Sequence, residues 1–503
     1  MARTVAMREV GRALEGRTIT RRELLRRAAG AGAAAALLAR AELAPAATRP
    51  RIAIVGGGIA GLTAALTLAD RKIPSTVYEA SQRLGGRMHS DGPLLGSNYF
   101  QGQVAELCGE LIDTDHVTIR ALARRFHLPL TDLYRYGPEN ATETYRFLGR
   151  YLSDAEISRA FRPVYATIRK QLRAAPYPTL WNRHTSAAAA LDRLSLHDWI
   201  ERYVPGGHRS ALGRLLDVAY DEEFGAETRD QSSLNVLYLI AEQPKHGFSV
   251  YGAEDERYHI EDGNQRLPER IGEHLTLTGL VALERGRLLN TVALGPNGRV
   301  SLWFDGSRAP VVADHVILAT SFAVLRTLDT TRAGFDARKR AAINGLGAGR
   351  NAKLQLQFDE RYWNRRGPWG VSDGDAYTDV GIQDTWEPSL GQPGRHAILN
   401  DYSGGDLAGS YQPARPYSTA ADDPRVKGYA KEFLKRLEHV FPGVSRHWTG
   451  RAILSVPALD PNLRCAYSYW RVGQYTSIAG YERVRQGPRG QIHFGGEHCS
   501  VEL

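Results

Sequence analysis

A glycine-rich turn near the start of the chain has the residue types and the spacing of a phosphate-binding site. Gly56, Gly58 and Gly61 occupy the first, third and sixth places of a G-x-G-x-x-G pattern. The four apolar residues 52–55 precede it, as in a buried parallel strand, and residues 62–70 follow with the apolar spacing of a helix. A strand, a tight turn and a helix N-terminus in this order present free N–H groups to a pyrophosphate.

A carboxylate completes this unit. Residues 75–79 read as a second strand that ends in Glu79, where the side chain can accept hydrogen bonds from ribose hydroxyls. We therefore predict a dinucleotide site; the alternative is a glycine-rich turn that holds no ligand. The cofactor-binding residues predicted in this unit are Gly56, Gly58, Ile59, Ala60, Gly61, Glu79 and Ala80.

A second glycine pair follows the carboxylate. Gly85 and Gly86 lie between Arg83 and Arg87; the glycines allow backbone to approach a ligand, and the arginines can balance pyrophosphate charge. This block resembles the second glycine motif of the flavin-containing amine oxidases, a family that includes monoamine, polyamine and L-amino-acid oxidases. The resemblance implies FAD as the cofactor and disfavours an NAD-dependent dehydrogenase. It also implies an α/β fold, in which a Rossmann-like FAD-binding domain of the glutathione-reductase type carries an inserted α+β substrate domain.

Two further blocks resemble the same family. Residues 103–110 are similar to the segment that returns beneath the flavin, which implies that Gly109 and Glu110 contact the cofactor. The sequence Phe-Gly-Gly-Glu-His-Cys-Ser near the C-terminus is similar to the closing block, which places Gly496 at the pyrophosphate and Glu497 at the ribityl chain. Both ends of the mature chain are therefore expected to meet at one FAD.

The predicted catalytic segment is a strand over residues 350–358. Its alternation places Lys353, Gln355 and Gln357 on one face and apolar residues on the other. A lysine on a half-buried strand is costly unless it meets water or a polar partner. The family resemblance implies that Lys353 holds a water against the reactive nitrogen of the flavin; the alternative is a solvated lysine beside the sheet.

An aromatic stretch near the C-terminus resembles the family segment that lies against the flavin. It makes Tyr467 and Trp470 candidates for a pocket wall, although both could simply pack in the core. Cys465 stands eight residues before Gly473, where monoamine oxidases carry the cysteine that bonds to flavin. Because the neighbouring Cys-Tyr order is missing, non-covalent FAD is the preferred interpretation.

The substrate class depends on one missing arginine. L-amino-acid oxidases of this family usually carry an arginine soon after the Glu-Leu-Gly segment to bind the substrate carboxylate, whereas here the next one is Arg120. The missing arginine favours an amine over an amino acid. The resemblance then implies that a small amine is oxidised to an imine, which water hydrolyses to an aldehyde, while dioxygen is reduced to hydrogen peroxide. An L-amino-acid oxidase remains the alternative, since another arginine could serve.

The position of the last residue, Leu503, raises a third possibility. Family members normally continue with a turn and a helix that face the flavin. The chain could thus be a flavin-binding protein without turnover, or a homodimer or second polypeptide could complete the site.

Composition and charge exclude several other classes. Of the net charge of +9, residues 1–46 contribute nine Arg and four Glu, a net +5, and the rest shows no lysine-rich run or arginine-aromatic stripe, so nucleic acid is not an expected partner. No apolar run reaches membrane-spanning length. No metal site is predicted, because His116, His184 and His197 do not share ligand spacing on one helix.

The first 46 residues are expected to be a targeting signal and not part of the folded domains. Arg21 and Arg22 are followed by two leucines, then by an apolar run and the small residues 44–46, which resembles a bacterial twin-arginine signal. We predict export to the periplasm or medium; the alternative is a basic helix that the mature protein keeps.

The predicted divisions are a signal peptide (1–46), an FAD-binding domain (50–115, 260–345 and 462–503) and a substrate-binding domain (116–259 and 346–461). The helices expected in the latter span residues 116–127, 154–174, 186–203, 211–220 and 234–242.

Overall fold

The structure is a computed structural model that describes residues 49–244 and 247–500. The leader expected over residues 1–46 and the last three residues lie outside the described part of the chain. Within that part, no helix combines the length and the apolar character needed to cross a membrane.

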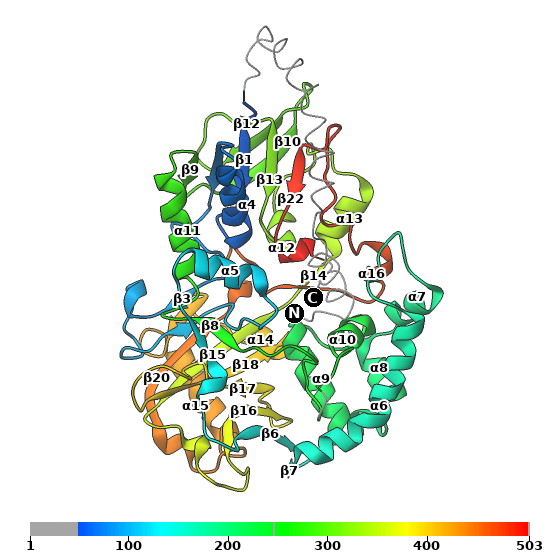
Figure 1. Cartoon of the computed structure of the whole chain (residues 1–503), viewed down its shortest axis with the longest axis vertical. Coiled ribbons are helices and arrows are strands. Elements are labelled where there is room, and N and C mark those ends of the chain that lie inside the picture. The colour runs from blue at the N-terminus through cyan, green and yellow to red at the C-terminus, as the bar shows by residue number, and fades with distance from the viewer. Residues whose placement is uncertain (1–48, 245–246, 501–503) are drawn as a thin grey trace, which may run out of the picture.

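A five-stranded parallel sheet draws on both ends of the described chain (Figure 1). Its order is β22-β13-β1-β2-β9, so that β13 separates the strand of the first glycine turn from the strand of the closing block. The strands are β1 (Ile52–Val55), β2 (Ser75–Tyr78), β9 (Val281–Glu284), β13 (His315–Leu318) and β22 (Ile492–Phe494). This is the Rossmann-like sheet predicted from the sequence.

Alternation along β1 explains what covers the two faces of this sheet. Ile54 packs in a core with residues of helices α4 (Ile59–Asp70) and α11 (Arg266–Leu277). Ala53 and Val55 belong instead to the core that includes a small antiparallel sheet. That sheet contains β10 (Leu289–Leu294), β11 (Val300–Phe304) and β12 (Val311–Ala313). The period-two pattern of a buried strand thus fixes a three-layer arrangement.

The mostly apolar segment over residues 311–318 forms two strands that belong to different sheets. β12 ends at Ala313 in the small sheet, and β13 begins at His315 in the parallel sheet. Asp314 lies between them, and its carboxylate accepts the backbone N–H of Arg51 at 2.9 Å. This contact with Arg51 fixes the point where the chain passes from the small antiparallel sheet to the parallel sheet. The pattern of apolar residues does not predict this change of sheet.

An eight-stranded sheet forms the second half of the molecule, in the order β19-β20-β15-β18-β17-β16-β6-β7 (Figure 1). The strands are β6 (Thr142–Phe147), β7 (Arg150–Leu152), β15 (Asn351–Phe358), β16 (Ser372–Thr378), β17 (Asp384–Trp386), β18 (Ala397–Gly404), β19 (Tyr417–Thr419) and β20 (Trp448–Ser455). β15 lies between β18 and β20, and all eight of its residues are buried.

The two faces of β15 have different partners. Leu354, Leu356 and Phe358 pack in a core with the helix α15 (Pro424–Leu437). The opposite face carries the predicted lysine and the two glutamines, which bond to residues 100–110. The expected alternation is therefore present, but the polar face is buried against the chain and does not face solvent.

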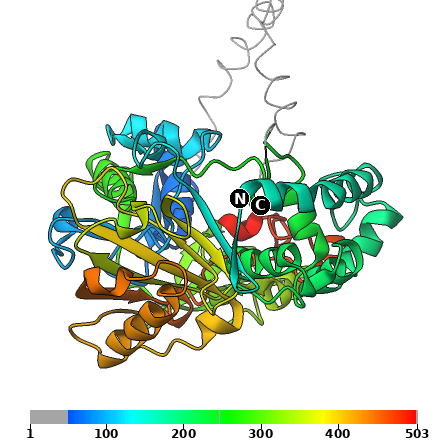
Figure 2. The same ribbon diagram turned by 90° about the horizontal axis from the view of Figure 1, so that it is seen from below.

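A helical lobe lies beside the eight-stranded sheet (Figure 2). Its helices are α6 (Asp154–Ala174), α7 (Ser186–Asp192), α8 (Leu196–Tyr203), α9 (Ala211–Phe224) and α10 (Ser233–Leu239). The helix α5 (Val117–Arg125), expected in the substrate domain, lies instead against the parallel-sheet half (Figure 1), where Arg125 pairs with Asp70 of α4 at 2.7 Å. The single helix expected over residues 186–203 is broken, because Ser195 caps a new helix by accepting the N–H of Asp198 at 3.0 Å.

Shorter elements complete the described chain. The helices are α12 (Phe322–Leu325), α13 (Ala337–Gly345), α14 (Gly405–Gly409) and α16 (Gln474–Ser477). The strands are β3 (Ser90–Asp91), β4 (Ala105–Glu106), β5 (Leu130–Asp132), β8 (Tyr258–Ile260), β14 (Gly347–Ala348) and β21 (Ser468–Tyr469).

Candidate functional site

One cavity of about 960 Å³ lies between the two sheets and the helical lobe. It is large enough for a dinucleotide and a small substrate. Of the residues predicted to form the site, those that line it are Gly56, Gly58, Ile59, Ala60, Glu79, Ala80, Arg83, Gly85, Gly86, Arg87, Gly109, Glu110, Lys353, Tyr467, Trp470, Gly496 and Glu497. The remaining one, Gly61, is buried beneath the first glycine turn.

The two glycine turns pack against each other without room for side chains. A Cβ at Gly61 would lie 1.9 Å from the carbonyl oxygen of Gly56, and a Cβ at Gly86 would lie 3.3 Å from the Cα of Gly58. Gly56 and Gly86 also have positive φ angles of 105° and 57°. The backbone of both turns is therefore exposed to the cavity at close range, as binding of a pyrophosphate requires.

Glu79 is held beside the first turn by two backbone amides. Its carboxylate accepts the N–H of Gly57 at 2.7 Å and the N–H of Ser81 at 2.8 Å. The same carboxylate lines the cavity. The predicted contact with a ribose thus has a fixed acceptor at the end of β2.

The two arginines around the second glycine pair have different partners. Arg83 donates to the carbonyl oxygens of Leu84, Gly86 and Met88, which stabilises the turn itself. Arg87 pairs with Glu497 at 2.9 Å and so joins the two ends of the described chain. Both arginines were expected to balance pyrophosphate charge; in the structure both guanidinium groups also bond to protein acceptors while they border the cavity.

The Arg87–Glu497 pair also involves the segment that carries the aromatic residues. Glu497 accepts the hydroxyl of Ser468 at 2.6 Å, and Arg87 donates to the carbonyl of Ala466 at 2.8 Å. Burial opposes ionisation of Glu497, but the charges of Arg87 and His498 lower its pKa below the usual value. The closing block, the second glycine turn and the aromatic stretch are therefore held together at the cavity.

Lys353 makes a buried ion pair. Its Nζ lies 2.7 Å from Oε2 of Glu110, and the two side chains are 8% and 3% exposed. The other oxygen of Glu110 accepts the indole N–H of Trp386 at 3.1 Å. A lysine that faces solvent beside the sheet is thus excluded, and the polar partner that its burial demands is Glu110.

The aromatic candidates occupy two environments. The hydroxyl of Tyr467 lies 2.9 Å from that of Tyr402 and donates to the carbonyl of Glu222 at 3.1 Å, so Tyr467 stands at the cavity. Trp470 touches the cavity but is 4% exposed and stacks obliquely on Tyr475 with centroids 5.2 Å apart. Tyr467 fits the expected wall, while Trp470 both packs the core and borders the site.

The cysteine considered for a covalent link lies outside the cavity lining. Cys465 is 3% exposed, and its thiol contacts the carbonyl oxygen of Leu463 at 3.6 Å. A different cysteine, Cys108, borders the cavity, with its sulfur 3.8 Å from the hydroxyl of Tyr417.

Acidic side chains gather at the end of the cavity formed by α9 and the strands β6, β16 and β17. Those that line it are Glu143, Glu222, Glu223, Glu254, Asp255, Glu256, Asp373, Asp375, Asp384 and Glu387. The cationic side chains among the described lining residues are Arg83, Arg87, Arg287 and Lys353. Arg83 and Arg87 flank the second glycine pair and Lys353 is paired with Glu110, so few cationic side chains of the described residues remain to balance the acidic end.

Two of these acids have buried oxygens without a partner. Glu222 and Asp384 are 1% and 4% exposed, yet Oε2 of Glu222 and Oδ1 of Asp384 accept no hydrogen bond from any described residue. Burial, and then the charge of a neighbouring acid, raises the pKa of both carboxyl groups. Such groups are costly without a cation or donor, so this end of the cavity is suited to a positively charged ligand.

No local pattern in the sequence predicts this acidic end. Its acids come from separate segments of the chain, and only their folding brings them together. The Glu222–Glu223 pair and the alternation of Asp373 with Asp375 were the signals available, and acids in such patterns usually face solvent.

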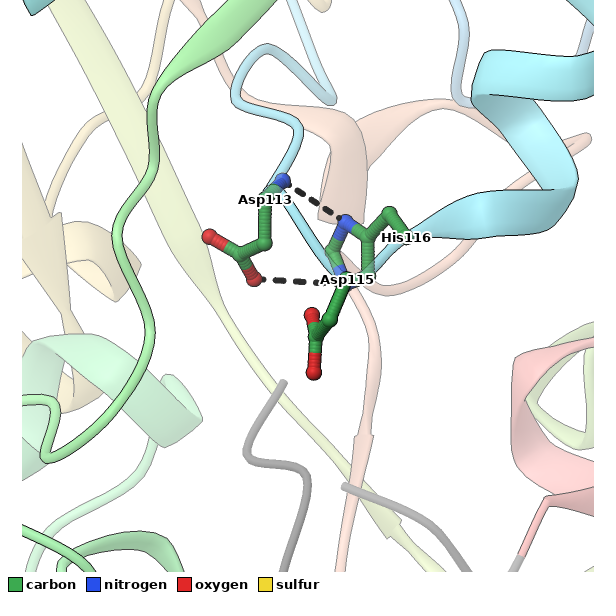
Figure 3. A group of neighbouring side chains, drawn as sticks. All are labelled: Asp113, Asp115 and His116. Carbon is green, nitrogen blue, oxygen red and sulfur yellow. Dashed lines mark hydrogen bonds and ion pairs between the residues drawn. The ribbon is translucent and has the colours of Figure 1, made fainter. Parts of the chain in front are cut away.

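A separate group of ligand-type side chains, Asp113, Asp115 and His116, lies at the start of α5 (Figure 3). One oxygen of Asp113 accepts the backbone N–H groups of Asp255 and Glu256, and the other lies 3.3 Å from His116. The Asp113 carboxylate therefore anchors the loop over residues 255–256, and this role accounts for its position without an ion.

Residues 59–503 match the family model described as flavin containing amine oxidoreductase. The chain belongs to this family. It is 24% identical over 484 residues to the lysine-specific histone demethylase 1B homolog of Caenorhabditis elegans (90% of this chain, 53% of that protein). It is 22% identical over 475 residues to the L-amino-acid oxidase of Mus musculus (90% and 67%). The chain thus spans about half the length of the demethylase homolog.

A solved structure shows that this oxidoreductase shares the fold of the family. The cyclohexylamine oxidase from Brevibacterium oxydans IH-35A superposes with a TM-score of 0.71 and 17% identity, covering 90% of this chain and 94% of that one. At this level of identity the likeness concerns the fold.

The cofactor of this flavoenzyme is FAD, and the described residues fit it. Gly56, Gly58, Gly85 and Gly86 border the cavity, so no side chain stands between the backbone of the two turns and a ligand such as the pyrophosphate. Glu79 and the Arg87–Glu497 pair, at opposite ends of the sequence, border the same cavity. The prediction that both ends of the chain contribute to one site therefore agrees with the fold.

The stability of this oxidoreductase is expected to depend on pH through Glu106, which lies behind the cavity wall. Its carboxyl accepts hydrogen bonds from Ser90 and the backbone of Asn264, but burial raises its pKa from 4.5 to about 8. Between these values the folded state binds more protons than the unfolded state, so the free energy of unfolding falls as the pH rises.

Relative to the parent, Glu106→Gln should therefore gain stability from about pH 5 to about pH 9, by up to about 1.4 kcal/mol for each unit of pKa shift. Urea unfolding of both proteins at several pH values measures this difference. A difference that does not change with pH would contradict the raised pKa of Glu106.

Proposed function

We propose that this flavoenzyme oxidises an amine that carries a second positive charge, and that dioxygen is reduced to hydrogen peroxide. Bound FAD would supply the redox chemistry: two electrons leave the substrate with the hydrogen on the carbon next to nitrogen and with one proton from nitrogen, and dioxygen takes them up as hydrogen peroxide. The protein contributes binding, orientation and exclusion of water. The observation that carries the proposal is that one buried carboxylate oxygen on Glu222 and one on Asp384 accept no hydrogen bond from any described residue.

The charge distribution in the cavity supports an amine over an amino acid. An α-carboxylate would need a free cation, and the acidic end offers carboxylates instead. Arg120, the first arginine after the segment that returns beneath the flavin, donates to the carbonyl of Thr114 and stacks 4.8 Å from the ring of Tyr258. It lies outside the cavity lining, so it supports no carboxylate-binding role.

The aromatic side chains are proposed to orient the reacting amine. Tyr467 and Tyr402 join through their hydroxyl groups, and Trp386 stands edge-on to Tyr402 with centroids 5.0 Å apart. Rings at this place can exclude water from a neutral amine group while the acidic end holds a distant ammonium group.

A substrate panel tests the proposal. Hydrogen peroxide release is measured with linear diamines and polyamines, with monoamines of matched length and with L-amino acids. The diamines or polyamines are expected to react with the lowest KM. Faster reaction of the amino acids would establish an L-amino-acid oxidase, and yellow protein that no amine bleaches under nitrogen would establish flavin binding without turnover.

Removal of the carboxylate of Glu222 or of Asp384 should weaken binding of the doubly charged amine. Glu222→Gln and Asp384→Asn are each expected to raise its KM by about 10- to 100-fold, since a hydrogen bond to a charged group contributes about 1.5–3 kcal/mol. The KM of a monoamine of matched length should change much less.

Asp401→Asn is the matched control. Asp401 is equally buried in the neighbouring strand β18, also has an unpartnered oxygen, and lies outside the cavity lining. An equal rise in KM for this variant, or for both amines, would contradict a role of the acidic end in binding the second charge.

We further propose that residues 1–46 direct export. The twin arginines Arg21 and Arg22 support this, and the test is the location of a reporter fused to these residues. Replacement of both arginines by lysine should retain the reporter inside the cell.

A further inference from the structure

The contacts of Glu110 give it a role beyond the cofactor contact expected from the sequence. We propose that Glu110 is a positioning residue for Lys353: it fixes the lysine ammonium at the cavity wall so that its other N–H groups serve the flavin reaction. This inference rests on the proposed flavin-dependent oxidation, and its test separates the two.

The ion pair is buried and short. Nζ of Lys353 lies 2.7 Å from Oε2 of Glu110, and neither side chain is more than 8% exposed. A buried ion pair stabilises a fold less than its Coulomb energy suggests, because both charges lose their hydration. Separation of the two groups would leave each charge buried and unpaired, which is costly. The pair therefore keeps the ammonium and the carboxylate in one relative position.

Glu110 is itself held from two sides. Its second carboxylate oxygen accepts the indole N–H of Trp386 at 3.1 Å, and its backbone carbonyl accepts the side-chain amide of Asn264 at 2.6 Å. The same amide donates to the carbonyl of Gly109 at 3.1 Å. The carboxylate therefore has little freedom to follow Lys353, and the lysine must adopt the position that Glu110 sets.

The arrangement leaves donors on Lys353 for other partners. An ammonium group has three N–H donors, and the hydrogen bond to Glu110 uses one. Among the described residues no other acceptor bonds to Nζ, although Lys353 lines the cavity. Two donors thus remain for a water or ligand in the cavity, and their direction is set by the bond to Glu110.

Without Glu110 the lysine would have competing partners. Lys353 and the acidic residues line one cavity, and Nζ already lies 5.3 Å from the ring centroid of Trp386. A free lysine side chain has several rotamers of similar energy, so loss of the pair would spread the ammonium group over several positions.

The test compares four holoenzymes: parent, Glu110→Gln, Lys353→Met and the double variant. Each is reduced with dithionite under nitrogen, and the rate of reoxidation by dioxygen is followed at the flavin absorption band. This measurement requires no amine. A second readout is the visible spectrum of the oxidised flavin together with the FAD dissociation constant.

Glu110→Gln should slow reoxidation by about 10- to 100-fold and shift the flavin absorption band, and it should keep FAD affinity within about threefold. Lys353→Met should be at least as slow, and the double variant should equal Lys353→Met, because Glu110 acts through the lysine. Parent rates in Glu110→Gln, or effects of the two substitutions that multiply in the double variant, would overturn the proposal.

Two further variants complete the test. Gln357→Met removes a buried side chain from the same face of β15 that bonds to the carbonyl of Phe100, outside the cavity lining, and should leave the reoxidation rate unchanged. Trp386→Phe removes the other hydrogen bond to Glu110, and should slow reoxidation less than Glu110→Gln. If Glu110→Gln fails to fold, slower reoxidation in Trp386→Phe that disappears in the Lys353→Met background supports the proposal, and a parent rate overturns it.

The outcomes for the two proposals differ. A parent enzyme whose flavin no amine reduces, but whose reoxidation depends on Glu110 through Lys353, refutes the proposed oxidation and keeps this inference. If the parent oxidises amines and Glu110→Gln oxidises them at the same rate, the proposed oxidation is supported and the inference about Glu110 is refuted.

Discussion

Lys353→Met protein is expected to bind FAD and to be yellow, but to oxidise amines at least about 100-fold more slowly than the parent. The substitution keeps an unbranched side chain of similar length in a strand where every residue is buried. It removes the ammonium group from the cavity wall and leaves Glu110 without its ion-pair partner. Stopped-flow measurement of flavin reduction under nitrogen, followed by reoxidation with dioxygen, assigns the loss to one half-reaction or to both.

Lys339→Met provides the control for this experiment. Lys339 is another fully buried lysine, on α13, where it donates to the carbonyl of Tyr481 at 3.0 Å and lies outside the cavity lining. Its loss should lower thermal stability while turnover per bound FAD stays at the parent level. Parent turnover in Lys353→Met would remove Lys353 from the proposed chemistry.

Gly61→Ala is expected to give a protein without bound FAD. The added Cβ would lie 1.9 Å from the carbonyl oxygen of Gly56, so the first glycine turn must open or the helix α4 must move away from β1. Either change displaces the N–H groups that face the cavity. Absorbance near 450 nm after purification and a titration with added FAD measure the loss, which should be at least about 100-fold in affinity.

The control for Gly61→Ala is Gly428→Ala. Gly428 is an exposed glycine inside the helix α15, and a Cβ there would meet nothing within 4 Å. This variant should bind FAD as the parent does and gain up to about 1 kcal/mol in the free energy of unfolding, because alanine is the better helix former. FAD bound to Gly61→Ala with parent affinity would show that the turn tolerates a side chain.

The sequence was most informative where local pattern and tertiary structure agree. The strand, glycine turn and helix over residues 52–70 depend on backbone conformations that few other residues adopt, so their composition reveals them. The helix over residues 154–174 was also predicted with its observed bounds, from its helical periodicity; in the structure Ser153 and Glu156 form a capping box at its start. Such features are encoded within a few residues of one another.

The sequence was least informative where distant segments meet. The partner of Lys353 lies 243 residues away in the chain, and no local pattern connects the two. The acidic end of the cavity gathers side chains from separate elements, each unremarkable alone. The change of sheet at Asp314 likewise depends on a contact with Arg51, 263 residues earlier.

The strand order of the parallel sheet has a consequence for biosynthesis. β22, which starts at Ile492, pairs with β13, and Glu497 just after it is bonded to Arg87, 410 residues away. Until these late residues leave the ribosome, β13 presents an unpaired edge and the nucleotide pocket lacks one wall. Contacts of such high sequence separation form slowly, so FAD should be captured only after residues 492–497 have emerged and paired with the earlier part of the chain.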